Sequence, residues 1–149
     1  MIADERARVV QEAERWRGTP FHHGARIHGA GIDCANLLVA VFCGLGLCAE
    51  PAIAPYSPDW FLHGADDLLR RWVAEYCVWG APPELGDIAL FRFGRFASHA
   101  GIVVQVDPLD VVHSFRGAGV QRDSVAPGMA LSARLHSVWT LKRWATCPD

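Results

Sequence analysis

The chain has 149 residues, of which 51% are hydrophobic, and its formal net charge is −2. This length and composition predict one folded domain over residues 1–149. The slightly acidic charge argues against a broad basic surface, so we expect no nucleic-acid partner. The longest apolar run without a charge, residues 34–49, is short for a membrane span, and we expect no membrane partner. The N-terminus lacks a basic segment followed by an apolar one, so we expect synthesis in the cytoplasm without a secretion signal.

Apolar periodicity predicts three helices in the first half of the chain. The first covers residues 4–17, and a glycine- and histidine-rich loop follows at 21–32. The second begins at 33–34, ends at 44–46 and is apolar on all sides, which predicts a buried central helix. The third covers 60–76 and follows a proline-rich connection.

From residue 87 onward the apolar period changes to two, which predicts strands joined by short turns. The predicted strands cover residues 87–93, 98–106, 111–115, 120–125 and 137–144. Helices first and antiparallel strands after them predict an α+β fold. We expect the central helix to pack on an antiparallel sheet or partial barrel.

Among the cysteines, Cys34 is the candidate for chemistry. The five cysteines are odd in number and form no CxxC pair, which predicts neither a disulfide framework nor a zinc finger. Cys34 stands at the predicted start of the central helix, where N–H groups and the helix dipole stabilise a thiolate. We therefore expect Cys34 to be the one cysteine with a strongly lowered pKa. The alternative is a buried structural cysteine, which is what we expect of the other four.

Two histidines on predicted strands are candidates to act with Cys34. His99 follows Ser98 at a strand start, and Gly101 leaves room for a bulky group, which the first turn of the central helix could fill. If the next strand pairs with this one as a hairpin, His113 lies beside His99 and orients its ring. Taken singly, His99 has the alternative of a surface histidine and His113 that of a core histidine. Together, the order of nucleophile, base and orienting group is typical of covalent acyl transfer.

Four stretches resemble the NlpC-type family (NlpC and p60) of bacterial cell-wall cysteine peptidases. They are residues 17–21 (RGTPF), 31–34 (GIDC), 85–91 (LGDIALF) and 98–103 (SHAGIV). The resemblance implies a papain-like core that hydrolyses peptidoglycan peptide stems, at the bond between the γ-carboxyl of D-glutamate and a diamino acid. It implies Cys34 as nucleophile, His99 as base and His113 as the orienting group, with no cofactor and no metal.

Two departures from the family pattern lie close to Cys34. Many members have tyrosine where Phe21 stands, with its hydroxyl near the nucleophile. Either His22 or His23 substitutes for that hydroxyl, or backbone N–H groups alone stabilise the oxyanion. Ala35-Asn36 replaces the common Ser-Gly, which we expect to change packing and not chemistry. We expect the substrate to bind against Phe21, His22, His23, Asp33 and Ser98.

The branch that the chain most resembles is encoded with phage-tail and gene-transfer-agent genes. This implies tail proteins as partners and a peptidase that a particle carries to the cell wall. Tyr56, Trp60 and Trp79, near proline-rich connections, are candidates for docking onto a tail protein.

Several alternatives stay open on the sequence. His22, His23 and His28 form the candidate ligand set of a metal site, if their rings converge. A second alternative is a non-catalytic tail-tip module. A third is another amidase or a lipid acyltransferase on the same core. A peptidase of this kind could also recycle wall fragments in the cytoplasm.

Overall fold

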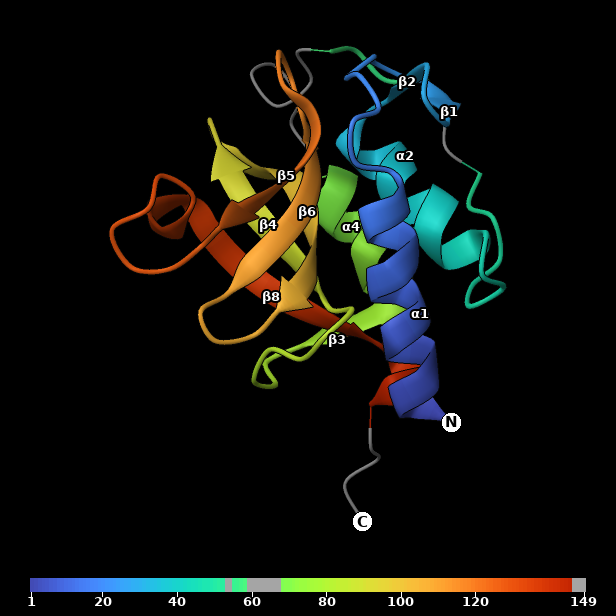
Figure 1. Cartoon of the computed structure of the whole chain (residues 1–149), viewed down its shortest axis with the longest axis vertical. Coiled ribbons are helices and arrows are strands. Elements are labelled where there is room, and N and C mark those ends of the chain that lie inside the picture. Colours follow the sequence, from blue (N-terminus) through green and yellow to red (C-terminus); the bar gives the residue numbers. More distant parts are fainter. Residues whose placement is uncertain (53–54, 59–67, 146–149) are drawn as a thin grey trace.

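The computed structural model describes residues 1–52, 55–58 and 68–145 (Figure 1). Its helical elements are α1 (Ile2–Arg15), α2 (Cys34–Leu38), the π-helical turn η1 (Val39–Cys43), α4 (Leu68–Tyr76) and the 3₁₀ turns η2 (Ser132–Arg134) and η3 (Lys142–Trp144). Its strands are β1 (Arg26–Ile27), β2 (Gly31–Ile32), β3 (Cys77–Trp79), β4 (Ile88–Phe93), β5 (Phe96–Gln105), β6 (Asp110–Phe115), β7 (Gly119–Ser124) and β8 (Leu135–Leu141). No helix in these ranges is long and apolar enough to cross a membrane.

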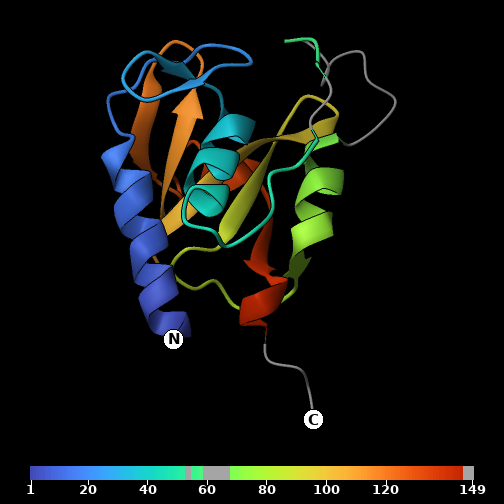
Figure 2. The same ribbon diagram turned by 90° about the vertical axis from the view of Figure 1, so that its right-hand side faces the viewer.

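Six of the strands form one antiparallel sheet in the order β3-β8-β4-β5-β6-β7. The helices α1, α2 and α4 lie side by side against one face of this sheet, with α2 in the centre (Figure 2). The predicted α+β class and the central helix are therefore confirmed. A separate two-stranded ribbon, β1 with β2, lies within the loop predicted for residues 21–32.

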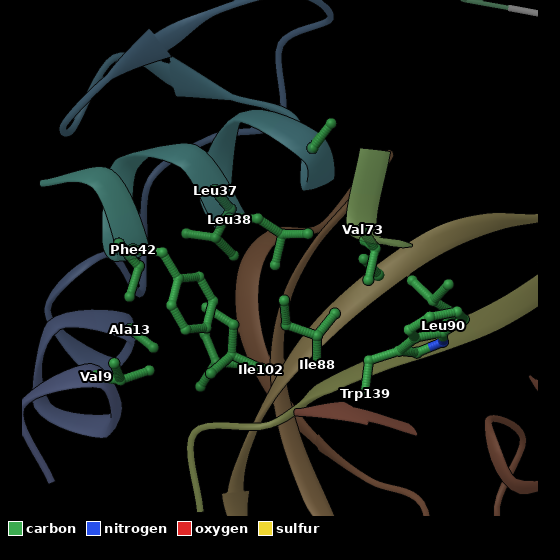
Figure 3. Close-up of a cluster of buried hydrophobic side chains, with 14 of the residues drawn as sticks. Val9, Ala13, Leu37, Leu38, Phe42, Val73, Ile88, Leu90, Ile102 and Trp139 are labelled. Carbon is green, nitrogen blue, oxygen red and sulfur yellow. The ribbon is translucent and has the colours of Figure 1, made fainter. Parts of the chain in front are cut away.

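Hydrophobic side chains fill the space between the helices and the sheet. Figure 3 shows this core, which includes Val9, Ala13, Leu37, Leu38, Phe42, Val73, Ile88, Leu90, Ile102 and Trp139. A smaller cluster, with Phe91, Val103 and Leu131, covers the opposite face of the sheet. Strands β4 and β5 are therefore buried on both faces, and β5 has no exposed residue between Ala97 and Val104.

The observed elements differ from the predicted ones mainly at their ends. The first part of the predicted third helix, residues 60–67, lies outside the described residues, and α4 accounts for the remainder. Strand β3 was not predicted, because three residues paired with β8 are too short to show an alternating pattern. The predicted closing strand at 137–144 stops at Leu141 and continues as the η3 turn.

A buried ion pair fastens α1 to the sheet. The Nη1 of Arg6 donates to Oδ1 of Asp87 at 2.8 Å, and Thr140 of β8 donates to the same oxygen at 2.9 Å. The Arg6 guanidinium also lies over the ring of Trp144, 4.4 Å from its centroid. Losing one partner of such a pair strands a buried charge and costs about 3–5 kcal/mol. The Gly86-Asp87 element of the sequence resemblance thus has a structural role, outside the pocket that contains Cys34 and His99.

Two further contacts hold the start of α2 above the sheet. Thr19 accepts from the backbone N–H of Val120 at 2.8 Å, which attaches the loop after α1 to the edge strand β7. Gly119 makes this approach feasible, because a Cβ there would lie 2.6 Å from the Thr19 carbonyl oxygen. On β6, the Ser114 hydroxyl donates to the carbonyl of Ile32 at 2.7 Å. The residue pair that begins α2, Asp33 and Cys34, is thereby fixed over the ends of the strands.

Candidate active site

A pocket of about 220 Å³ opens where the N-terminus of α2 faces the adjoining ends of β5 and β6. Of the residues predicted for the site, six line this pocket: Cys34, His99, Phe21, His23, Asp33 and Ser98. His22 is exposed outside it, and its Nδ1 lies 3.3 Å from the His23 carbonyl. The pocket therefore joins segments that are distant in sequence, one from the helical half of the chain and one from the sheet.

The carboxylate of Asp33 organises the helical side of the pocket. Its Oδ1 accepts from the backbone N–H of Asn36 at 2.9 Å, which caps α2, and from the Asn36 side chain at 3.0 Å. Its Oδ2 accepts from the backbone N–H of Gly24 at 2.8 Å and from the hydroxyl of Tyr56. The side chain is only 4% exposed, and these four bonds occupy its acceptor sites. Asp33 thus acts as a structural anchor between the glycine-rich loop, α2 and Tyr56.

The expectation of a lowered pKa for Cys34 is wrong. Burial raises the pKa of the Cys34 thiol to about 12, and the neighbouring Asp33 carboxylate raises it further. Backbone N–H groups of Ala100, Ala35 and Cys34 itself act in the opposite direction on this pKa, but they do not outweigh burial. The helix start does supply the predicted donors. Cys34 is partly exposed to the pocket, but the surrounding chain desolvates its thiol, and desolvation disfavours the charged form. No local pattern in the sequence reveals this desolvation.

His99 is buried in a cage of aromatic rings. Its ring centroid lies 5.9, 5.5 and 5.5 Å from those of Phe91, Phe93 and Phe115, respectively. Burial in this apolar cage lowers the pKa of His99 to about 3, and the nearby His113 lowers it further. Cys34 and His99 therefore rest as a neutral thiol and a neutral imidazole, a state in which His99 can accept a proton.

Hydrogen bonds connect His99 to two further side chains across neighbouring strands. Its Nε2 lies 2.7 Å from Nδ1 of His113, so the predicted proximity of the two histidines is confirmed. The Nε2 of His113 in turn lies 2.6 Å from Oδ2 of Asp123 on β7. Asp123 was not predicted. The alternation of polar Gln121 and Asp123 along this strand was the available signal, because it places both beside His113.

The space left by Gly101 was predicted to be filled by the first turn of the central helix, and this is wrong. A Cβ at Gly101 would lie 3.0 Å from Cβ of Val111 and 3.4 Å from Cβ of His113, so the space accommodates β6 and not the helix. The alternation of β5 accounts for the difference. Ala100 and Ile102 face the core under the helices, so Gly101 between them faces the other side of the sheet.

Tyr56 supplies the phenol hydroxyl that Phe21 lacks. It comes from the proline-rich connection, and its carbonyl oxygen accepts from Nε2 of His23 at 2.8 Å. Burial raises the pKa of Tyr56, and its hydrogen bond to Asp33 and the nearby Cys34 raise it further, so the phenol stays protonated. The contact of the Tyr56 hydroxyl with the site was not predicted, because only His22 and His23, next to Phe21, were considered as substitutes for the missing hydroxyl. Tyr56 was instead a candidate for docking, whereas its ring packs in the pocket against Trp72, with centroids 5.6 Å apart.

The three histidines considered as metal ligands do not converge. The Nε2 of His23 faces the Tyr56 carbonyl, and the Nε2 of His28 lies 3.0 Å from the carbonyl of Arg15. Within the described ranges, no three His, Cys, Asp or Glu side chains gather as a metal site. Cys43, Cys48 and Cys77 line a separate apolar pocket, and Cys147 lies outside the described residues.

A cysteine at the start of a helix packed on an antiparallel sheet, with a histidine on that sheet, defines a papain-like α+β fold. Among solved structures, this fold is that of NlpC/p60 domains, in agreement with the resemblance seen in the sequence.

The comparisons with known proteins support this fold through structure and not through sequence. The NlpC/p60 domain of the peptidoglycan hydrolase SagA matches 91% of this chain and 98% of its own, with a TM-score of 0.59 and 17% identity. A lipoprotein-like protein of the NLP/P60 family from Staphylococcus aureus subsp. aureus Mu50 matches 93% of this chain and 41% of its own, with a TM-score of 0.66 and 14% identity. Searches against family profiles and curated proteins find no match.

The burial of His99 predicts an acid-sensitive fold. In the unfolded chain the ring takes up a proton below about pH 6.5, whereas the folded protein resists protonation until about pH 3. Stability should therefore fall as the pH decreases through this window. Each pKa unit corresponds to about 1.4 kcal/mol, so the loss is on the order of a few kcal/mol. Urea unfolding at about pH 7 and about pH 4 measures it.

His99→Gln should flatten this pH dependence, because glutamine does not titrate. The matched control is His136→Gln, since His136 is exposed on β8. An equal loss of stability on acidification in wild type and His99→Gln would contradict the prediction.

Proposed function

We propose that this protein is a cysteine peptidase that hydrolyses the peptide stems of bacterial peptidoglycan. The observation that carries the proposal is the pocket in which Cys34, at the N-terminus of α2, and His99, hydrogen-bonded to His113, are both accessible to one ligand. The SagA domain, a peptidoglycan hydrolase with the same fold, supports the substrate class. The bond proposed for cleavage joins the γ-carboxyl of D-glutamate to a diamino acid.

The chemistry begins from a neutral pair. As Cys34 Sγ attacks the scissile carbonyl carbon, His99 takes the thiol proton as a general base. The backbone N–H groups of Cys34 and Ala35 already point toward the thiol, so they are the nearest donors for the negative charge of the tetrahedral intermediate. His99 then gives its proton to the leaving amine, and a thioester of Cys34 remains. Water that loses a proton to His99 hydrolyses this thioester and restores the thiol.

Neutral resting partners fit this role of His99. An imidazole with a pKa lowered by burial is unprotonated at physiological pH, so it has a free electron pair for the thiol proton. The lowered pKa also makes the ring a weaker base, so the transfer relies on stabilisation of the charges that form during attack. His113 holds the ring by its hydrogen bond, which supports the Cys–His–His assignment over a mechanism with Cys34 alone.

Arg116 gives the pocket an anionic preference. Its guanidinium lies over the ring of Phe21, 5.8 Å from the centroid, and donates to the Pro58 carbonyl at 3.4 Å. A guanidinium has five N–H donors, and among the described residues Pro58 accepts from one of them. In a γ-D-glutamyl bond to a diamino acid, the free α-carboxylate sits on the α-carbon, two methylene groups from the carbonyl of the scissile amide. A carboxylate bound by Arg116 would hold that amide in the pocket.

Digestion of purified peptidoglycan, read by mass spectrometry, tests the activity. Wild type should release peptides cut after γ-D-glutamate. Cys34→Ala and His99→Ala should each lower turnover by at least ~10³-fold, because nucleophile and base act as a unit. His113→Ala should be milder, because water can replace part of the orienting hydrogen bond.

Cys43→Ala and His136→Ala are the matched controls, since both residues lie outside the pocket. Intact peptidoglycan after incubation with folded wild type would favour the non-catalytic module. Products joined to an added amine or alcohol, and not to water, would favour an acyltransferase.

Arg116→Gln tests the anionic preference. On a stem peptide with a free α-carboxylate at D-glutamate, KM should rise about tenfold or more, because a charge-assisted hydrogen bond contributes about 1.5–3 kcal/mol. On the amidated stem the same variant should behave like wild type. Steady-state kinetics on both synthetic peptides measure this, with the exposed Arg8→Gln as control. An equal change on both peptides would refute the carboxylate contact.

Association with a phage or gene-transfer-agent tail is a proposal from the sequence resemblance. Of the three aromatic residues suggested for docking, Trp79 is 70% exposed, Tyr56 lies in the pocket and Trp60 is outside the described residues. Blotting of purified particles against the cytosol of the producing cell tests the association, and we expect the protein in the particles. Protein confined to the cytosol, with particles fully infective when they carry Cys34→Ala, would favour recycling of wall fragments.

A further inference from the structure

The hydrogen bond between the two histidines of the site is compatible with two arrangements of their ring protons. A neutral imidazole carries its proton on Nδ1 or on Nε2, and only the unprotonated nitrogen can act as a base. His99 and His113 share one hydrogen bond, between Nε2 of His99 and Nδ1 of His113. Either ring can donate in this bond. The direction of donation decides which nitrogen of His99 is free to accept the Cys34 proton.

Asp123 determines which of these two arrangements forms. Its Oδ2 lies 2.6 Å from Nε2 of His113, and an ionised carboxylate can only accept a hydrogen bond. The proton of His113 therefore resides on Nε2, which leaves Nδ1 as an acceptor. His99 must then donate from its own Nε2, and its Nδ1 is left with a free electron pair.

The carboxylate is itself held in position. The side-chain amide of Gln121 donates to the same Oδ2 at 2.5 Å, and both residues lie on β7 next to His113 of β6. The Asp123 side chain is 40% exposed, whereas His113 is 2% exposed. The chain of hydrogen bonds thus runs from a solvated carboxylate through one buried ring to another.

We propose that Asp123 is a positioning residue that fixes the tautomers of His113 and His99, so that Nδ1 of His99 is the basic nitrogen. This inference rests on the proposed function for its consequence in catalysis, but the tautomers themselves are independent of any substrate. Without the carboxylate, His113 can donate from Nδ1, and His99 then carries its proton on Nδ1, where it cannot act as the base.

Asp123→Asn tests the proposal, because the amide has the shape of the carboxylate but can donate to His113. Long-range ¹H–¹⁵N correlation spectra of the imidazoles report which nitrogen carries the proton. The chain has seven histidines, and the signals of two of them are assigned with His99→Gln and His113→Gln. In wild type we expect an unprotonated Nδ1 on His99. In Asp123→Asn a substantial fraction of His99 should carry the proton on Nδ1.

Kinetics on the stem peptide give the second readout. In Asp123→Asn we expect kcat to fall at least about tenfold with KM unchanged, since the carboxylate acts on the base and not on the substrate. Asp123→Glu, which keeps the acceptor, should recover most of the loss. The matched control is Asp110→Asn, because Asp110 lies on the same sheet but pairs with Arg122.

Asp123→Leu is the deciding variant, because the oxygen of asparagine can still accept from His113, whereas leucine offers neither an acceptor nor a donor. Wild-type tautomers in Asp123→Leu would overturn the proposal, and so would a wild-type kcat in it. The spectra separate this inference from the proposed function. If the protein cleaves no peptidoglycan but its His99 tautomer changes in Asp123→Asn, the proposed function is refuted and the role of Asp123 stands.

Discussion

The buried carboxylate of Asp33 is the constraint on which the candidate site depends. Four hydrogen bonds converge on it, from the backbone and side chain of Asn36, from the loop at Gly24 and from the Tyr56 hydroxyl. A carboxylate this deeply buried is stable only when its acceptor sites are occupied. The requirement fixes where α2 begins, and so where Cys34 stands. It also draws two loops that are separate in sequence onto the same side of the pocket.

This anchor has an electrostatic consequence for the Cys34 thiol. The Asp33 charge and burial both disfavour a thiolate on Cys34, and the aromatic cage disfavours an imidazolium on His99. The protein therefore keeps both groups neutral at rest, although the backbone donors at the helix start suit a thiolate. A thiol in this state is protected from oxidation and alkylation, which act on the thiolate. In the proposed mechanism, charge develops only as His99 takes the thiol proton during attack on a bound carbonyl.

The loops around the pocket show how a missing group is replaced from elsewhere in the chain. Phe21 has no hydroxyl, but Tyr56 brings one to the Asp33 carboxylate, near Cys34. The ring of Phe21 is left to support the Arg116 guanidinium. Asn36, expected to affect packing alone, instead donates to the anchoring carboxylate. The departures from the family pattern are thus linked, because they change the partners of one buried group.

Local pattern in the sequence was sufficient for part of this description. The apolar pattern predicted a helix start at residues 33–34. The alternation around His99 and His113 predicted two strands that, paired as a hairpin, bring the two rings together. Such features follow from the periods of helices and strands, which depend on neighbouring residues only. They also made the α+β class predictable, together with Cys34 and His99 as candidates for one site.

The tertiary structure decided what depends on distance between segments. The roles of Asp123 and Tyr56 come from strand register and loop packing, and neither residue stands in a recognisable motif. The pKa directions of Cys34 and His99 depend on how completely the surrounding chain excludes water, which no local pattern encodes. The bulge of β5 at Ser98 likewise arises from pairing between strands. Sequence alone determined which groups this protein can use, whereas their ionisation and partners were set by the packing of α2 against the sheet.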